Sequence, residues 1–199
     1  MLSAILYILA AASLCGAAVF ALLAEVDVFY MSGSKPIKND GLRRGTVTAP
    51  TWTLISSTGK IVHSPPKEAS LQLIVFGDHS LKSFPSVVEG LKNLTLLDPL
   101  LDIVVLTRHP NPSAVQVLRT LGLGGLPVVT GSSALYGKYN VRVVPFVIFV
   151  DSDGQARGSS LVNHAWQLEK LWRLARVPPD PSEISPPRRS RRHPVRARV

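Results

Sequence analysis

The stretch from residue 71 to residue 85, LQLIVFGDHSLKSFP, constrains the fold of this chain more than any other part of it. Leu71–Phe76 is a continuous apolar run bounded by turn residues, which is typical of a central strand covered on both faces. Gly77 ends this strand, and a helix is expected to open between Ser80 and Pro85. Unpaired amides and the positive end of a helix stabilise an anion at such a strand–turn–helix junction. We therefore expect the chemistry of the protein at this turn.

Apolar periodicity predicts further strands and helices on both sides of this stretch. A hairpin is expected around the turn Ser57–Lys60, with an edge strand before it, and Asn111 is a candidate N-cap. The expected strands are 101–106, 126–129, 145–150 and 155–160, and the expected helices are 86–97, 112–121, 132–139 and 163–176. This order predicts an α/β fold with a mixed central sheet of four or five strands flanked by helices.

The last predicted helix is amphipathic. Its apolar side is expected to consist of Trp166, Leu168, Leu171, Trp172 and Leu174. At this spacing the two tryptophans are expected in the core rather than in a ligand site.

The N-terminus predicts a membrane anchor. Residues 2–23 carry no charge, and as a helix at about 1.5 Å per residue they reach roughly 33 Å, enough to cross a bilayer. A cleaved signal peptide would need a positive start and a shorter apolar core. We expect residues 1–24 to be a single-pass transmembrane helix, with Cys15 as a small apolar residue in lipid. The cations Lys35, Lys38, Arg43 and Arg44 follow this segment, which by the positive-inside rule favours a cytoplasmic domain.

Composition divides the rest of the chain into three parts. Residues 25–45 are expected to be a juxtamembrane linker, residues 46–177 the folded domain, and residues 178–199 a disordered tail rich in Pro and Arg. Six of the last twelve residues are arginines, and without these six the net charge of +9 would fall to +3. Contact with anionic lipid, at about 1 kcal/mol per arginine, is one interpretation, and a merely solubilising tail is the other. Nucleic acid is not expected as a partner, because no aromatic residues are interleaved with the arginines.

A single cysteine, Cys15, excludes an intramolecular disulfide, a four-cysteine zinc site and catalysis by a thiol pair. The histidines His63, His79, His109 and His164 show no ligand spacing such as H-x-x-x-H, so no metal site is predicted. We expect no cofactor.

Three motifs, in this order, resemble the thioredoxin arrangement of redoxin and TlpA-like domains. They are A-P-x-W-x-L from Ala49, followed by Thr58-Gly59-Lys60, and V-V-P-F from Val143, where these folds carry a cis-proline. The C-terminal half is most similar to MauD, a family of thioredoxin-like accessory proteins for methylamine dehydrogenase. That similarity lies in L-G-L-G-G-L-P from Leu121, Y-N-V from Tyr139, D-x-D-G from Asp151 and G-x-x-L-V-N from Gly158. The resemblance implies thiol–disulfide chemistry, a membrane helix and an extracytoplasmic domain, and this last point disagrees with the positive-inside rule.

The chain departs from this family at the site itself. Aligned on the strand, the two family cysteines fall on Ser80 and Ser83, and aligned on Pro85 they fall on Gly77 and Ser80. Both thiols are absent in either register, so the disulfide exchange of the family cannot be carried over. An autonomous enzyme is therefore not expected.

The sequence Asp78-His79-Ser80 is not expected to be a catalytic triad, because triad partners normally come from separate segments. His79 is expected as an exposed turn residue, and Ser80 or Ser83 as a cap of the following helix.

These observations predict a membrane-anchored, redox-inactive accessory protein that assembles or stabilises a partner protein, with a dehydrogenase as one candidate. The expected partner-binding residues are Asp78, His79, Ser80, Val144 and Pro145. Strand addition at Pro145 is one interpretation of the last two, and a purely structural turn is the other. Two alternatives stay open, namely an oxidoreductase that works with a partner's thiols and a structural subunit of a membrane complex.

Overall fold

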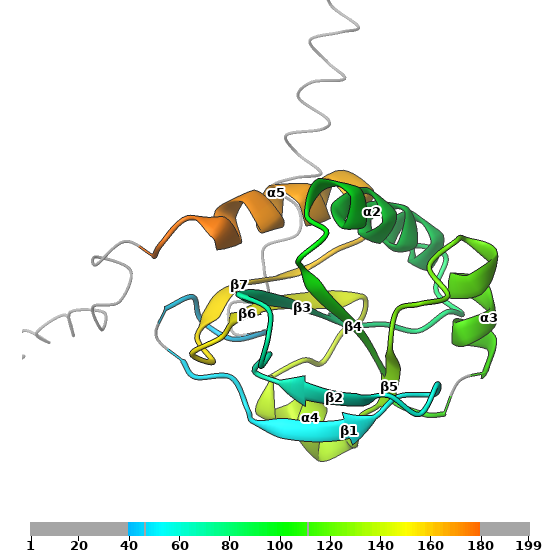
Figure 1. Ribbon diagram of the computed structural model, residues 1–199, viewed down its shortest axis with the longest axis horizontal. Helices are drawn as coiled ribbons and strands as arrows, with labels where there is room; N and C mark the ends of the chain where they lie inside the picture. Colours follow the sequence, from blue (N-terminus) through cyan, green and yellow to red (C-terminus); the bar gives the residue numbers. More distant parts are fainter. Residues whose placement is uncertain (1–39, 46, 111, 180–199) are drawn as a thin grey trace, which may run out of the picture. The chain divides into compact units, whose positions relative to one another are not determined.

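The computed structural model describes residues 40–45, 47–110 and 112–179, which contain a five-stranded mixed sheet (Figure 1). Its strand order is β5-β4-β3-β6-β7. The strands are β3 (Leu71–Phe76), β4 (Asp102–Thr107), β5 (Val128–Thr130), β6 (Phe146–Asp151) and β7 (Ala156–Leu161). The predicted mixed sheet of four or five strands is thus confirmed.

Strand β3 is the centre of this sheet, as its apolar run predicts. All six of its residues are buried. It pairs in parallel with β4 and antiparallel with β6, so both of its edges are hydrogen-bonded. A strand that is paired on both edges and covered on both faces must be apolar nearly throughout, which is why its sequence shows no alternation.

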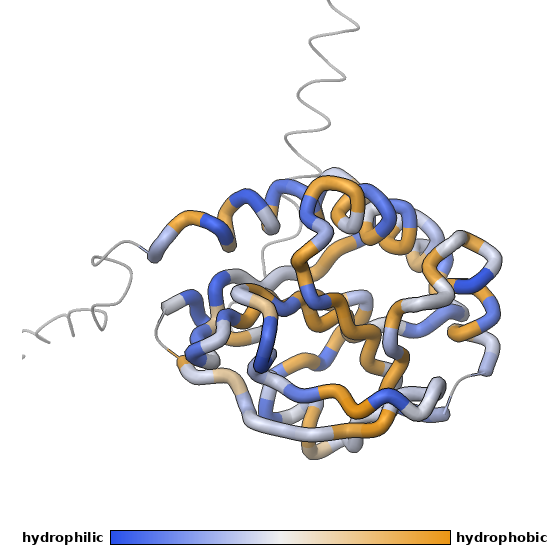
Figure 2. The backbone as a smooth tube through the Cα atoms, viewed as in Figure 1, coloured by the Kyte–Doolittle hydropathy of each residue, from blue (hydrophilic) through white to orange (hydrophobic). Residues whose placement is uncertain are grey.

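Helices cover one face of the sheet, and a helix and a hairpin cover the other (Figure 1). Residues of α2 (Phe84–Leu97), α3 (Pro112–Thr120) and α5 (Ala165–Arg176) pack on the first face, against β-strand side chains such as Leu73 and Val105. Tyr136 of α4 (Ser133–Lys138) and Val62 pack on the second face, against Ile74 and Val104. Figure 2 shows the hydrophobic strands enclosed between these layers.

The hairpin predicted near the start of the domain is a separate two-stranded sheet of β1 (Trp52–Ile55) and β2 (Ile61–Ser64). Trp52 Nε1 donates a hydrogen bond to the hydroxyl of Tyr139, at 2.9 Å. The N–H of Ser57 donates to the carbonyl of Val128 at 2.8 Å, which joins the hairpin to the edge strand β5. The hairpin is therefore held over the second face of the main sheet.

Helix α5 differs from its prediction in the position of one tryptophan. Trp172 packs on the core, and its Nε1 donates to Oδ2 of Asp98 at 3.1 Å. Trp166 and Leu174, however, are exposed, and Trp166 stacks on His164 instead. Their expected place in the core was wrong, because the helix presents only a narrow stripe around Leu168 and Ala175 to the sheet.

Residues 40–45, expected to be linker, lie against the domain. The side chain of Leu42 is buried, and its carbonyl accepts a hydrogen bond from the Ser159 hydroxyl at 2.8 Å. Gly41 has φ of +82°, and a Cβ there would come within 2.6 Å of the Phe146 ring, so only glycine fits. Leu42 therefore packs as part of the folded domain.

Several predictions fall outside the described residues. They are the anchor at 1–24, most of the linker at 25–45, the N-cap Asn111, and the tail from residue 180 onward. Within the described ranges, no helix has the length and apolar character needed to cross a bilayer.

Candidate functional site

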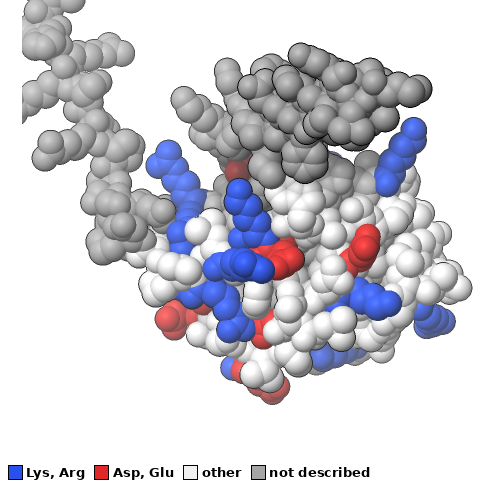
Figure 3. Space-filling view, turned by 90° about the horizontal axis from the view of Figure 1, so that it is seen from above, with Lys and Arg blue, Asp and Glu red and all other residues white. Residues whose placement is uncertain are grey.

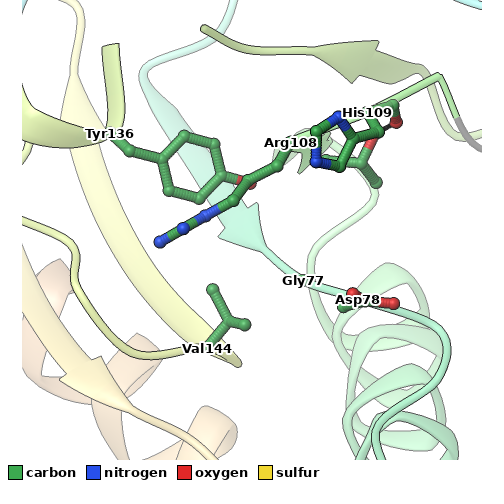
Figure 4. Close-up of a pocket in the computed structure, with 7 residues that line it drawn as sticks. Gly77, Asp78, Arg108, His109, Tyr136 and Val144 are labelled. Atoms are coloured by element: carbon green, nitrogen blue, oxygen red, sulfur yellow. Dashed lines mark hydrogen bonds between the residues drawn. The ribbon is translucent and has the colours of Figure 1, made fainter. Parts of the chain in front are cut away.

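A small pocket of about 50 Å³ lies where the central strands end (Figure 4). Strands β3 and β4 are parallel, so the residues that follow both strands meet at one edge of the sheet. The N–H of Gly77 donates to the carbonyl of Leu106 at 3.1 Å and extends this pairing into the turn. The pocket is lined by Gly77, Asp78, Thr107, Arg108, His109, Tyr136 and Val144.

The turn after β3 is organised by Asp78. Its Oδ1 accepts the backbone N–H of Ser80 at 3.0 Å and the Ser80 hydroxyl at 2.9 Å. Nδ1 of His79 lies 3.4 Å from the same oxygen. The backbone hydrogen bond from Ser80 is the main reason why the pKa of the Asp78 carboxyl is lowered, and the Ser80 hydroxyl and the charges of His79 and His109 add to it against the effect of burial. Asp78 is therefore an ionised turn residue at neutral pH.

The two serines of the turn differ in role from their prediction as caps. Ser83 occupies the N-cap position of α2, but its side chain makes no capping hydrogen bond. Ser80 donates its hydroxyl to Asp78 and stands outside the helix. In this turn the side chain that accepts a hydrogen bond from the backbone is that of Asp78. An Asp carboxylate readily accepts a hydrogen bond from the backbone N–H two residues later.

The alternative register for the lost cysteine pair conflicts with the packing of this turn. A Cβ built on Gly77 would lie 2.9 Å from Cε2 of Phe84, whose side chain is buried in the core. A residue larger than glycine at position 77 thus requires Phe84 to move. Ser80 is exposed and Ser83 is half-buried, so positions 80 and 83 accept side chains without that cost.

The wall opposite this turn is the loop before β6. The Val144–Pro145 peptide bond is cis, as the resemblance implies. Val144 lines the pocket, and its neighbour Val143 is 42% exposed. Among the described residues, neither the N–H nor the C=O of Val144 pairs with another backbone group.

Sequence reasoning missed four residues of the pocket, namely Thr107, Arg108, His109 and Tyr136. The first three directly follow β4, and the rule that parallel strands place their carboxyl ends at one edge could have pointed to them. His109 was considered only as a metal ligand. Tyr136 carried no signal, because its place depends on how α4 packs beneath the sheet.

Arg108 and Tyr136 lie side by side in the lining of the pocket. The Arg108 guanidinium carbon lies 4.8 Å from the centre of the Tyr136 ring (Figure 4). The Tyr136 hydroxyl donates to the carbonyl of Leu106 at 2.9 Å. Burial raises the pKa of Tyr136 strongly, against a smaller opposing effect of Arg108, so the phenol is neutral. The exposed cation of the pocket is therefore held over an uncharged ring.

This arrangement does not form a nucleophile. The Ser80 hydroxyl is bonded to a carboxylate rather than to an imidazole base, so the order of groups in a Ser-His-Asp triad is not present. No group of three or more His, Cys, Asp or Glu side chains with the geometry of a metal site occurs in the described part of the chain. The pocket offers a cation, an ordered carboxylate, and the apolar side chain and backbone of Val144.

No protein-family model and no curated protein matches this chain. Solved structures do. A thiol:disulfide interchange protein named DsbE from Chlorobium tepidum superposes with a TM-score of 0.58 at 16% identity, over 67% of this chain and 95% of that one. The thioredoxin domain of a thiol-disulfide oxidoreductase from Bacteroides vulgatus gives 0.54 at 16% identity, over 65% and 97%. The chain has a thioredoxin-like fold. A peroxiredoxin-like protein from Aquifex aeolicus, at 0.53 and 12% identity over 68% and 90%, shares it as well.

Proposed function

We propose that this protein is a membrane-anchored, redox-inactive accessory protein that resembles MauD and holds a segment of a partner protein in the pocket between the Gly77–Ser83 turn and the Val144–Pro145 loop. The observation that carries the proposal is a pocket at the carboxyl ends of β3 and β4 that is built of binding groups and has no thiol. A partner that the protein assembles or stabilises, such as a dehydrogenase subunit, would insert an extended segment there.

Backbone pairing at Val144 supports the binding of an extended segment. Its N–H and C=O have no backbone partner among the described residues, and they stand beside the pocket rather than inside the sheet. An extended peptide can satisfy such groups by strand addition, while side-chain pockets select its sequence. Val143 and Val144 would contact the apolar side chains of that segment.

Charge would set the register of the segment. Arg108 and Asp78 lie on different walls of the pocket, one after β4 and one after β3 (Figure 4). A segment with an acidic group toward Arg108 would gain a charge-assisted hydrogen bond, and the reverse order would place like charges together. The pocket therefore favours one direction of the bound chain over the other.

Site-specific photo-crosslinking tests the proposal. A photoreactive residue would replace Val143 beside the pocket or, as a matched control, Val47, which is 38% exposed at the opposite end of the sheet beside Ala156. We expect the probe at position 143 to capture one partner in stoichiometric yield from native membranes, and the probe at position 47 to capture none. The Val144→Pro variant removes the backbone N–H and should abolish the crosslink.

Equal capture at both positions, or a crosslink that survives Val144→Pro and Arg108→Ala, would contradict binding in this pocket. Capture of many cysteine-bearing proteins in low yield would instead indicate a general holdase.

A further inference from the structure

Three leucines stand exposed at the end of α2 that lies farthest from the pocket. The exposed fractions are 75% for Leu96, 53% for Leu97 and 81% for Leu100. We name these three residues the leucine patch. Exposed single leucines are common, but three within five residues concentrate apolar surface at one place, as interaction sites do.

The fold does not require leucine at these positions. The core-facing residues of α2 end with Leu94, and the next core residue in the chain is Leu101. Leu96 and Leu97 lie on the outer side of the helix, and Leu100 lies in the connection to β4. Polar residues would form the same helix end without loss of packing, so packing of the core does not explain these leucines.

Three cations lie near the leucine patch, and two of them are in ion pairs. Lys92 is exposed one helical turn before Leu96, and Arg176 of α5 binds Asp98 between Leu97 and Leu100. Arg173 lies one turn of α5 away and pairs with Glu169. Figure 3, which looks onto the side of the domain that carries α2 and α5, shows lysine and arginine side chains there with aspartate and glutamate side chains among them. Asp98 is buried, and its charge is neutralised by Arg176.

We propose that the leucine patch inserts into the surface of a bilayer that contains anionic lipid. Apolar side chains at the headgroup boundary, with cations beside them, are the pattern of surface-bound proteins. A second copy of the chain is a poorer occupant, because a stable interface needs about 800 Å² from each partner and three leucines supply much less. A lipid surface requires no shape complementarity and accepts a small apolar insertion.

The segment before the domain is short enough to keep the leucine patch within reach of a bilayer. If residues 2–23 span a bilayer, residues 24–39 reach at most about 55 Å when fully extended. The domain then stays close to the membrane, and even a weak surface contact is occupied because its effective concentration is high. The inference is independent of the partner segment proposed for the pocket.

Docking through the leucine patch would also orient the domain. Helix α2 has 14 residues and is therefore about 20 Å long, with the pocket turn before its first residue and the patch at its last. Strand β4 likewise begins beside Leu100 and ends at Thr107 in the pocket. With the patch in the bilayer surface, the pocket would face away from the membrane, open to a partner.

An environment-sensitive fluorophore tests the proposal on the full chain. It would be attached to cysteine in a Leu97→Cys variant, with Cys15→Ser removing the native thiol, and in a matched Ile61→Cys variant. Ile61 is 59% exposed on the hairpin at the other face of the sheet. Both proteins would be reconstituted in vesicles of phosphatidylcholine with about a third phosphatidylglycerol.

We expect a blue shift and quenching by lipid-borne quenchers at position 97 but not at position 61. In the Leu96→Ser/Leu100→Ser background this signal should fall at least several-fold, and Lys92→Glu should weaken it most at low salt. No difference between positions 97 and 61 would overturn the proposal. A shift that grows with the number of protein copies per vesicle and resists the lipid-borne quenchers would overturn it in favour of self-association.

Discussion

Arg108 lies over the ring of Tyr136, 4.8 Å from its centre, and thereby holds a cation at the edge of the pocket. We predict that Arg108→Ala lowers crosslinking of the partner at position 143 by tenfold or more, because the acidic group of the segment loses its charge-assisted hydrogen bond. The free energy of unfolding should change by less than about 1 kcal/mol, the usual contribution of an exposed cation–π pair. Quantitative crosslinking and urea unfolding measure the two effects.

Lys60→Ala is the control for this variant, since Lys60 is an exposed cation in the hairpin turn outside the pocket. Equal losses of crosslinking from both variants would show that only the overall charge matters and that Arg108 has no specific place in binding.

Asp98 links the ends of α2 and α5, and its contribution should depend on pH. Burial raises the pKa of this carboxyl, but the hydrogen bonds from Arg176 and Trp172 and the charge of Arg176 outweigh burial, so the pKa is lowered overall. A lowered pKa stabilises the folded state above the unfolded value of about 3.9, and this contribution is lost as pH falls through the folded pKa. We predict that Asp98→Asn costs about 1 kcal/mol at pH 7, the difference between a charged and a neutral acceptor.

Urea unfolding of the natural protein and of Asp98→Asn, from pH 7 down to pH 3, would measure the difference in their free energies of unfolding. This difference should shrink below about pH 4. Asp153→Asn, at an exposed position in the β6–β7 turn, should leave stability unchanged over the same range. A cost for Asp98→Asn that stayed constant to pH 3 would show that shape rather than charge holds the two helices there.

Gly90 allows α2 and α5 to approach closely. A Cβ at this position would lie 3.0 Å from the Cα of Ala165 and 3.2 Å from Cδ2 of Leu168, and the backbone of α5 cannot easily yield. We predict that Gly90→Ala lowers the free energy of unfolding by about 1–2 kcal/mol, because overpacking exceeds the gain in helix propensity. Thermal or urea unfolding would measure this change in the free energy of unfolding.

Gly137→Ala is the matched helical control. Nothing lies within 4 Å of a Cβ at position 137, so this change should raise stability by up to about 1 kcal/mol. If Gly90→Ala were equally stabilising, the contact between the helices would be looser than the structure shows.

The sequence predicts most of this fold because its central strands are buried along nearly their whole length and therefore appear as continuous apolar runs. Leu71–Phe76 was expected as the central strand and has these bounds in the structure. The hairpin around Ser57–Lys60 follows from turn residues between two alternating segments. Trp166 shows where periodicity fails, since an amphipathic pattern does not tell how wide a stripe the sheet can cover.

The site was predictable on one side only. The turn after β3 is continuous in sequence and could be found by reading along the chain. Arg108 and Tyr136 reach the pocket from segments about 30 and 60 residues later, and only strand order and helix packing bring them to Asp78. Leu42 was missed for a similar reason. Its segment is polar and is typical of a linker, and only the structure shows that the Leu42 side chain is buried and that its carbonyl accepts a hydrogen bond from the Ser159 hydroxyl.

Restoring two cysteines tests whether the fold still supports thiol–disulfide exchange and lacks only the thiols. We predict that Ser80→Cys/Ser83→Cys, in a Cys15→Ser background, gains insulin-reductase activity that the natural protein lacks. The reason is that the positive end of α2 favours a thiolate at position 83, the N-cap of the helix, while the Asp78 carboxylate disfavours one at position 80. Turnover of a disulfide substrate by the natural protein would contradict the redox-inactive proposal and favour the use of a partner's thiols.

The pair Gly77→Cys/Ser80→Cys is the decisive comparison for the register. It should fold less stably and remain inactive, because its first side chain would collide with Phe84 at 2.9 Å. Ser80→Cys alone should also be inactive in reduction, since no second thiol is present to resolve the mixed disulfide. If activity appeared in the Gly77 pair and not in the Ser80–Ser83 pair, the family cysteines would align with positions 77 and 80, and the turn must then have rearranged around Phe84 when the thiols were lost.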